Sequence, residues 1–211
     1  MLWVLAACAP ESVTAQAGEA RHVFYLHGRI IEVQGLPAIS ERYGEYRFDA
    51  IQDRLAAEGF VVHAPVRPAN SDVDAQARQL VLEINDLIDG GVPAQNITVI
   101  GASKGAYIAS LVSHHAENPQ LRFVLLAGCA PAVTDHMVQN GIGFSGAVLT
   151  IRDSLDTLLA GSCQDVFNAS ENATQMRELV VETGLEHGLI YGPRDEWILP
   201  ALDWANAVSV R

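Results

Sequence analysis

The sequence lacks the motifs of the common metal and dinucleotide sites. It contains no His-Glu-x-x-His, no Cys-x-x-Cys and no Gly-x-Gly-x-x-Gly. The sequence therefore gives no indication of a zinc-peptidase site, a structural zinc site or a Rossmann-type cofactor site. We predict a protein that works with neither a metal nor a cofactor.

Basic residues are scarce, and long apolar runs are missing. Lysine and arginine number 13 against 25 acidic residues, which gives a formal net charge of −12. Such a balance argues against electrostatic binding of nucleic acid or of an anionic membrane surface. No apolar run is long enough to span a bilayer. With 211 residues, 49% hydrophobic and 18% charged, the chain fits one soluble globular domain.

The first ten residues are apolar and have a cysteine near their end. The stretch from Leu5 to Cys8 resembles the lipobox of bacterial lipoproteins, in which the cysteine is lipidated. The segment has no basic n-region, and its apolar part is short for a signal. We expect residues 1–21 to be a lipoprotein signal remnant and tether, and 22–211 to be the folded domain. The protein would then be periplasmic or anchored to the outer membrane through Cys8. The alternative is a cytoplasmic protein with a chance apolar N-terminus.

The most informative stretch is residues 96–110. Its apolar, β-branched start, Ile97–Ile100, indicates a buried strand, and residues 106–112 indicate a buried helix. Between them Gly101-Ala-Ser103-Lys-Gly105 matches Gly-x-Ser-x-Gly. The pattern alone also fits a glycine-rich turn with a solvated serine. A strand before it and a helix after it are the context that a nucleophile elbow requires, so we favour Ser103 as a nucleophile.

Strands and helices alternate along the rest of the chain. This alternation predicts an α/β fold with a mostly parallel sheet covered by helices on both faces. Ligands of such sheets bind at the carboxyl ends of the strands. Strands are expected at 22–28 (continuing into 29–31), 60–64, 121–127, 147–151 and 178–182, helices at 48–59, 71–90 and 195–208, a loop at 35–46, and uncertain structure at 128–146 and 164–175.

A serine nucleophile needs a base, and the base needs a carboxylate to orient it. Of seven histidines, His187 follows the last expected strand, which is the required sheet edge, so we favour it as the base. Two acids follow the strand that ends at Ile151. Asp156 is favoured over Asp153 because it lies one turn further along, where it can reach a histidine loop. The other histidines have poorer positions for a base: His22, His63, His114, His115 and His136.

The oxyanion hole requires two backbone N–H groups aimed at the developing charge. We expect one from Lys104, directly after the nucleophile at the start of a helix. The other is expected from Arg29, after the His27-Gly28 pair that ends the first strand. The Lys104 side chain is not required, because neighbouring residues at a helix start point in different directions.

Together these pieces resemble the α/β-hydrolase superfamily, and most closely its small, lidless bacterial serine hydrolases. The matching residues are His27-Gly28, the Gly101–Gly105 motif, an Asp after the next-to-last strand, and His187-Gly188. The resemblance implies the fold, a Ser103–Asp156–His187 triad and an acyl-enzyme route. The sequence departs from larger members in having little room before His22 for a leading hairpin, and too little between residues 127 and 147 for a cap domain. A site without a lid suits short or protein-borne acyl groups.

Two questions stay open at this level. Cys129 and Cys163 would pair in an oxidising compartment and remain free thiols in a cytosolic protein. We expect a carboxylesterase-like serine hydrolase that cleaves an ester, thioester or amide. The alternatives are an acyltransferase or peptidase that uses the same triad, and a surface lipoprotein that binds without catalysis.

Overall fold

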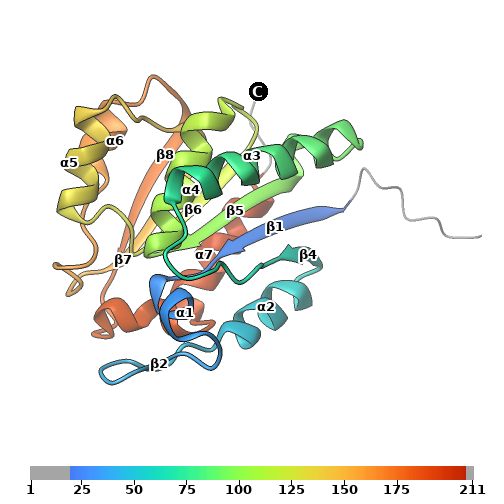
Figure 1. Cartoon of the computed structure of the whole chain (residues 1–211). Coiled ribbons are helices and arrows are strands. Elements are labelled where there is room, and N and C mark those ends of the chain that lie inside the picture. Colours follow the sequence, from blue (N-terminus) through green and yellow to red (C-terminus); the bar gives the residue numbers. More distant parts are fainter. Residues whose placement is uncertain (1–19, 208–211) are drawn as a thin grey trace, which may run out of the picture.

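A computed structural model describes residues 20–207 of the chain and contains a six-stranded sheet at its centre (Figure 1). The order of its strands is β4-β1-β5-β6-β7-β8, and every pairing between them is parallel. The strands are β1 (Arg21–Leu26), β4 (Phe60–His63), β5 (Ile97–Ala102), β6 (Arg122–Leu126), β7 (Ser145–Asp153) and β8 (Asn172–Val181).

Helices cover both faces of this sheet, as the alternating pattern predicts (Figure 1). Side chains of successive residues in a strand point to opposite faces. In β1, Val23 and Tyr25 belong to one core, and Phe24 and Leu26 belong to the other. The first core contains side chains of α1 (Arg29–Gln34), α2 (Phe48–Ala57) and α7 (Asp195–Asn206), and the second contains those of α3 (Val73–Asp89), α4 (Lys104–Ala116), α5 (Pro131–Gln139) and α6 (Gln164–Asn168).

The strand order reverses direction between β1 and β5. From β1 the chain passes outward to β4, then crosses to β5 on the other side of β1 and continues to β8. Loops leaving β1 and β5 therefore diverge at their carboxyl ends, which is where parallel sheets form ligand sites. Both the Gly-x-Ser-x-Gly turn and the His27-Gly28 pair lie at this point.

Three segments differ from the sequence prediction. Residues 29–31 begin α1 rather than continue the strand, with Gly28 in an extended conformation as its N-cap. The expected loop at 35–46 contains a two-stranded hairpin, β2 (Ile39–Ser40) and β3 (Gly44–Glu45). The last strand begins at Asn172 instead of residue 178, because polar side chains can occupy an exposed edge strand whose backbone pairs with β7.

The segment that connects β6 and β7 is short. Residues 127–144, between β6 and β7, hold only α5, so no cap domain interrupts the fold within residues 20–207. A helix long and apolar enough to cross a membrane does not occur among these residues either. The lipobox-like sequence at Leu5–Cys8 lies outside the described residues.

Candidate active site

Ser103 lies on a strained turn between a strand and a helix. It is the one residue between β5 and α4, and its φ of 54° and ψ of −116° are unusual for a residue with a side chain. The two glycines of the motif permit this turn. A Cβ at Gly101 would lie 2.2 Å from the Gly105 carbonyl oxygen, and one at Gly105 would lie 2.0 Å from the Leu26 oxygen. The sharp turn leaves Ser103 partly exposed above the sheet.

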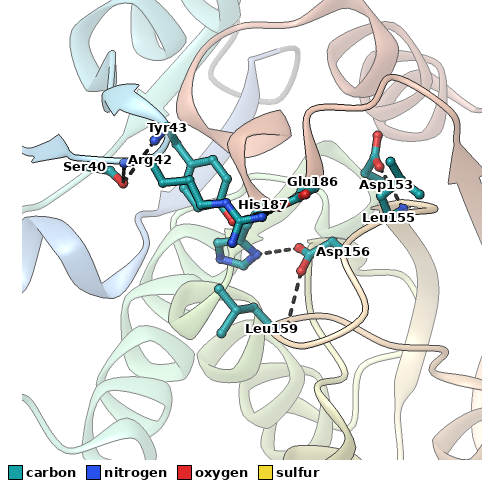
Figure 2. A network of polar contacts seen from close by, with 9 residues as sticks. All are labelled: Ser40, Arg42, Tyr43, Asp153, Leu155, Asp156, Leu159, Glu186 and His187. Carbon is teal, nitrogen blue, oxygen red and sulfur yellow. Dashed lines mark hydrogen bonds and ion pairs between the residues drawn. The ribbon is translucent and has the colours of Figure 1, made fainter.

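Ser103, His187 and Asp156 form a continuous hydrogen-bonded chain. The Ser103 Oγ lies 3.0 Å from His187 Nε2, and His187 Nδ1 lies 2.6 Å from Asp156 Oδ2. A carboxylate only accepts, so Nδ1 carries the proton and the free Nε2 accepts from the serine hydroxyl. His187 and Asp156 are 5% and 4% exposed, which shields the hydrogen bond between them from water, whereas the Ser103 side is partly open. Figure 2 shows the imidazole and the Asp156 carboxylate facing each other.

Asp153, the other acid considered, points to a different partner. Its carboxylate accepts hydrogen bonds from the backbone N–H groups of Leu155 and Thr183, both at 2.9 Å, and from the Thr183 hydroxyl. Burial disfavours the charged form, but these hydrogen bonds outweigh it and lower the pKa of Asp153. Asp153 therefore fixes the end of β7 to the loop after β8, and it leaves His187 to Asp156 (Figure 2).

The loop that carries Asp156 is held from both ends. Asp156 Oδ1 accepts from the Leu159 N–H at 3.3 Å, and the Gly161 N–H donates to the Gly128 carbonyl at 3.1 Å. A disulfide between Cys129 and Cys163 joins the turn after β6 to the start of α6. Asp156 therefore lies on a loop whose far end is fixed to the turn after β6.

The loop that carries His187 packs against the β2–β3 hairpin. His187 lies in a 3₁₀ helix, η2 (Glu186–Tyr191), and its ring centroid is 6.3 Å from that of Tyr43. The Tyr43 hydroxyl donates to Glu186 at 3.3 Å, and Arg42 forms an ion pair with the same carboxylate. Figure 2 shows Tyr43 beside His187. A surface groove of about 430 Å³ lies between the hairpin and η2, but Ser103 does not line it.

The turn after β1 lies directly against Ser103. A Cβ at Gly28 would be 3.7 Å from Ser103 Cβ. Arg29 and Lys104 are the first residues of α1 and α4. The first N–H groups of a helix have no partner within the helix, so both are available as donors. The two expected oxyanion donors thus begin helices on segments that meet at Ser103.

His27 is a buried, neutral hydrogen-bonding group behind this turn. Its Nε2 accepts from the Arg67 backbone N–H at 2.9 Å, so the proton lies on Nδ1, which donates to the Gly28 carbonyl at 2.8 Å. Burial, followed by the nearby Arg67 charge, lowers the pKa of His27 to about 4. The imidazole is therefore neutral at physiological pH.

A buried ion cluster lies next to His27. Glu32 on α1 binds Arg67 at 2.8 Å through Oε1 and the Lys104 Nζ at 2.6 Å through Oε2. Lys104 also donates to the Ser71 carbonyl at 2.8 Å. Burial opposes ionisation of Glu32, but the hydrogen bonds from Lys104 and Arg67 prevail and lower its pKa. The Lys104 side chain thus points away from a Ser–Lys dyad and toward Glu32.

The sequence interpretation missed this cluster. Glu32 lies within the apolar run Ile30–Val33, and a carboxylate in such a setting was a signal of a buried partner. Arg67 follows a strand and carried no pattern of its own. Other histidines bond elsewhere: His22 to His63 at 2.9 Å, His115 to Asp74 at 2.6 Å, and His136 to Asn140 at 3.2 Å.

No family model and no curated protein matches the sequence. Solved structures do match the fold. A gene product of Listeria innocua superimposes with a TM-score of 0.61 at 10% identity, over 91% of this chain and 96% of that one. An esterase of Pyrococcus furiosus gives a TM-score of 0.58 at 15% identity, over 88% and 83% of the two chains.

A third match is an α/β-hydrolase enzyme from a sediment metagenome of the Mar Chica lagoon in Morocco. It gives a TM-score of 0.53 at 17% identity, over 82% of this chain and 85% of that one. Identities this low carry information about fold alone. The chain has the α/β-hydrolase fold, as its motifs predicted, and it has this fold without a cap in the described residues.

Proposed function

We propose that the protein is a serine hydrolase that cleaves carboxylic esters, or related thioesters and amides, through an acyl-enzyme on Ser103. The observation that supports this proposal most strongly is the hydrogen-bonded chain from Asp156 through His187 to a serine on a strained strand–helix turn. Each of these three groups has the hydrogen-bond neighbour that nucleophilic catalysis requires.

In the first half of the proposed reaction, Ser103 Oγ attacks the substrate carbonyl carbon while its proton passes to His187 Nε2. Asp156 stabilises the imidazolium through Nδ1–H. The carbonyl oxygen becomes an oxyanion, which the N–H groups of Lys104 and Arg29 bind. Collapse of the intermediate breaks the bond to the leaving group, which takes the proton from His187 and departs as an alcohol, thiol or amine.

In the second half, a water molecule gives a proton to His187 and attacks the acyl carbon. The same oxyanion donors stabilise the second tetrahedral intermediate. The bond to Ser103 then breaks, the proton returns to Oγ, and the carboxylic acid leaves. Ester cleavage is the favoured reaction, because an alkoxide leaving group makes a smaller demand on the acid than an amine does.

The test is hydrolysis of p-nitrophenyl esters of short carboxylic acids by the wild-type protein beside its Ser103→Ala variant. We expect turnover by the wild type and none above background in the variant. Equal turnover by both proteins would contradict the proposal. Release measured with and without an added alcohol or amine separates a hydrolase from an acyltransferase, because only a transferase forms the new ester or amide in preference to the acid.

We also propose that the protein works in an oxidising compartment as a lipoprotein anchored through Cys8. The support is the Cys129–Cys163 disulfide, a bond that persists outside the reducing cytosol, together with the lipobox-like sequence. Metabolic labelling with a fatty acid should mark the wild-type protein and not a Cys8→Ala variant. Label retained by the variant, or absent from both, would contradict the anchor.

A further inference from the structure

We propose that the buried Glu32–Arg67–Lys104 cluster, acting through His27, positions the Arg29 N–H of the oxyanion hole, so that Arg67 and Glu32 are positioning residues for the reaction. This inference rests on the serine-hydrolase function proposed above. It assigns a role in catalysis to two side chains that are buried behind the turn after β1.

The first step in the argument is the geometry of one peptide unit. In a trans peptide the C=O and the N–H point in opposite directions. The Gly28 carbonyl and the Arg29 N–H belong to the same unit, and His27 Nδ1 donates to that carbonyl at 2.8 Å. While this hydrogen bond is formed, the Arg29 N–H points away from the imidazole. His27 thereby sets the direction of the donor.

The second step is what holds His27. Its other nitrogen accepts from the Arg67 backbone N–H at 2.9 Å, and the Arg67 guanidinium donates to the His27 carbonyl. Arg67 therefore contacts both the ring and the backbone of the same residue. These contacts favour the tautomer that donates to Gly28, because a protonated Nε2 would face the Arg67 N–H at 2.9 Å. Nδ1 has the Gly28 carbonyl at 2.8 Å, and the nearest guanidinium nitrogen is more distant, at 3.3 Å.

The third step links this turn to the nucleophile. Glu32 belongs to α1, the helix that Arg29 begins, and it binds both Arg67 and Lys104. Lys104 is the only lysine of the sequence, and its own N–H is the other expected oxyanion donor. One carboxylate therefore joins the two segments that carry the donors, and Arg67 connects it to His27.

Stability alone is a poor reason for this cluster. Arg67 and Glu32 have side chains that are 2% and 1% exposed, and buried ion pairs often stabilise a fold no more than apolar residues would. Among the described residues, Arg67 Nη1 is also buried without a hydrogen-bond partner, which is unfavourable. A buried ion pair that contributes little to stability, and that lies beside the turn at Ser103, is better explained by a role in orienting that turn.

The main test compares Arg67→Met with Arg78→Met. The first substitution leaves the Glu32–Lys104 pair intact, and the second breaks an exposed pair with Asp74 on α3. For Arg67→Met we expect kcat to fall by about 10- to 100-fold with KM within about 2-fold, since an oxyanion donor acts on the transition state. The affinity for an alkylboronic acid, which forms a tetrahedral adduct on serine, should fall with kcat. Arg78→Met should match the wild type.

A double-mutant cycle separates positioning from a general structural effect. If Arg67 acts through His27, the Arg67→Met/His27→Phe protein should lose no more kcat than His27→Phe alone. Arg67→Lys should recover little, because an ammonium lacks the planar donor set. Circular dichroism and thermal melts show which variants fold. If Arg67→Met does not fold, Glu32→Gln takes its place in the same comparison.

Three outcomes would overturn the inference. One is a folded Arg67→Met protein with wild-type kcat, and another is a raised KM at unchanged kcat, which would indicate substrate contact. The third is an additive loss of kcat when Arg67→Met and His27→Phe are combined. A failure of the proposed function looks different: the wild-type protein itself would then fail to react with a fluorophosphonate at Ser103, and the oxyanion role would fall with it.

Discussion

The proposed mechanism divides the site into a nucleophile side (Ser103) and an acid–base side (Asp156 and His187), and different kinds of contact hold the two sides in place. Around Ser103, glycines allow backbones to touch, and a buried ion cluster joins α1, the Arg67 loop and α4. Around Asp156 and His187, the segments are longer loops, held by hydrogen bonds to Asp153, a surface hairpin and a disulfide. Ser103 lies at the junction of a strand and a helix. Asp156 and His187 lie on connecting segments that depend on contacts with neighbouring loops.

Because their contacts differ, the two sides should respond to different perturbations. The nucleophile side depends on a neutral His27 and on buried charges, so low pH should loosen it. The acid–base side depends on a covalent bond between loops, so reduction should loosen it. The predictions below test whether the two sides can be disturbed separately.

The largest effect is expected from Asp156→Asn. An amide in place of the carboxylate removes the acceptor that holds the His187 Nδ1–H tautomer, and kcat should fall by about 10⁴-fold with the fold intact. Asp153→Asn is the matched control one turn away. It should reduce stability by weakening the contacts with Thr183 and Leu155, while kcat stays within about 10-fold. Steady-state kinetics measures both variants. A large loss of kcat for Asp153→Asn together with a small loss for Asp156→Asn would refute the assignment of Asp156.

The next effect concerns the disulfide. Cys129 and Cys163 are separated by 34 positions in the sequence, so opening the bond should reduce the free energy of unfolding by about 4 kcal/mol. The bond ties the end of the Asp156 loop to the turn after β6, so reduced protein should lose activity before it unfolds. Urea unfolding with and without dithiothreitol measures the first effect, and activity at low urea measures the second. A Cys129→Ser/Cys163→Ser protein that matches the oxidised wild type in both would contradict this account.

A smaller effect is expected from pH on the nucleophile side. The pKa of His27 is about 4 in the folded protein and near 6.5 when unfolded, so the unfolded state binds more protons between these values. Stability should therefore fall as pH drops from 6.5 to 4, by about 3 kcal/mol from this group. A His27→Asn variant should have a shallower slope, by up to about 1.4 kcal/mol per pH unit. Identical slopes in urea titrations would show that His27 titrates normally.

The smallest effect is expected from Tyr43→Phe. Its hydroxyl donates to Glu186 at 3.3 Å, at the exposed edge of the hairpin that packs on η2. Losing one such hydrogen bond should reduce stability by about 1 kcal/mol or less and change kcat by less than about 3-fold. A loss of 100-fold in kcat with unchanged stability would show that the tyrosine takes part in the reaction itself.

Much of this architecture could be predicted from the sequence, because the signals were local. The run Ile97–Ile100 and the glycines at 101 and 105 specify a strand, a tight turn and a helix within one stretch. The helix cap at Asp72, whose side chain accepts from the Ala75 N–H at 2.8 Å, was equally local. The position of His187 followed from its place after the last strand.

What the sequence could not give depends on contacts between distant segments. Glu32, Arg67 and Lys104 are spread over three segments, and only the crossover from β4 to β5 brings them together. The choice between Asp156 and Asp153 depended on which way a loop turns after β7. The edge strand β8 was underestimated because its residues are largely exposed and its order comes from pairing with β7.

The most direct test of the central claim, that Ser103 is an activated nucleophile, is intact-mass analysis after treatment with a fluorophosphonate. The account predicts a single covalent adduct on the wild-type protein, no adduct on Ser103→Ala, and slow labelling of Asp156→Asn. The absence of an adduct on a folded wild-type sample would contradict the mechanism and would favour a protein that uses this fold for binding alone.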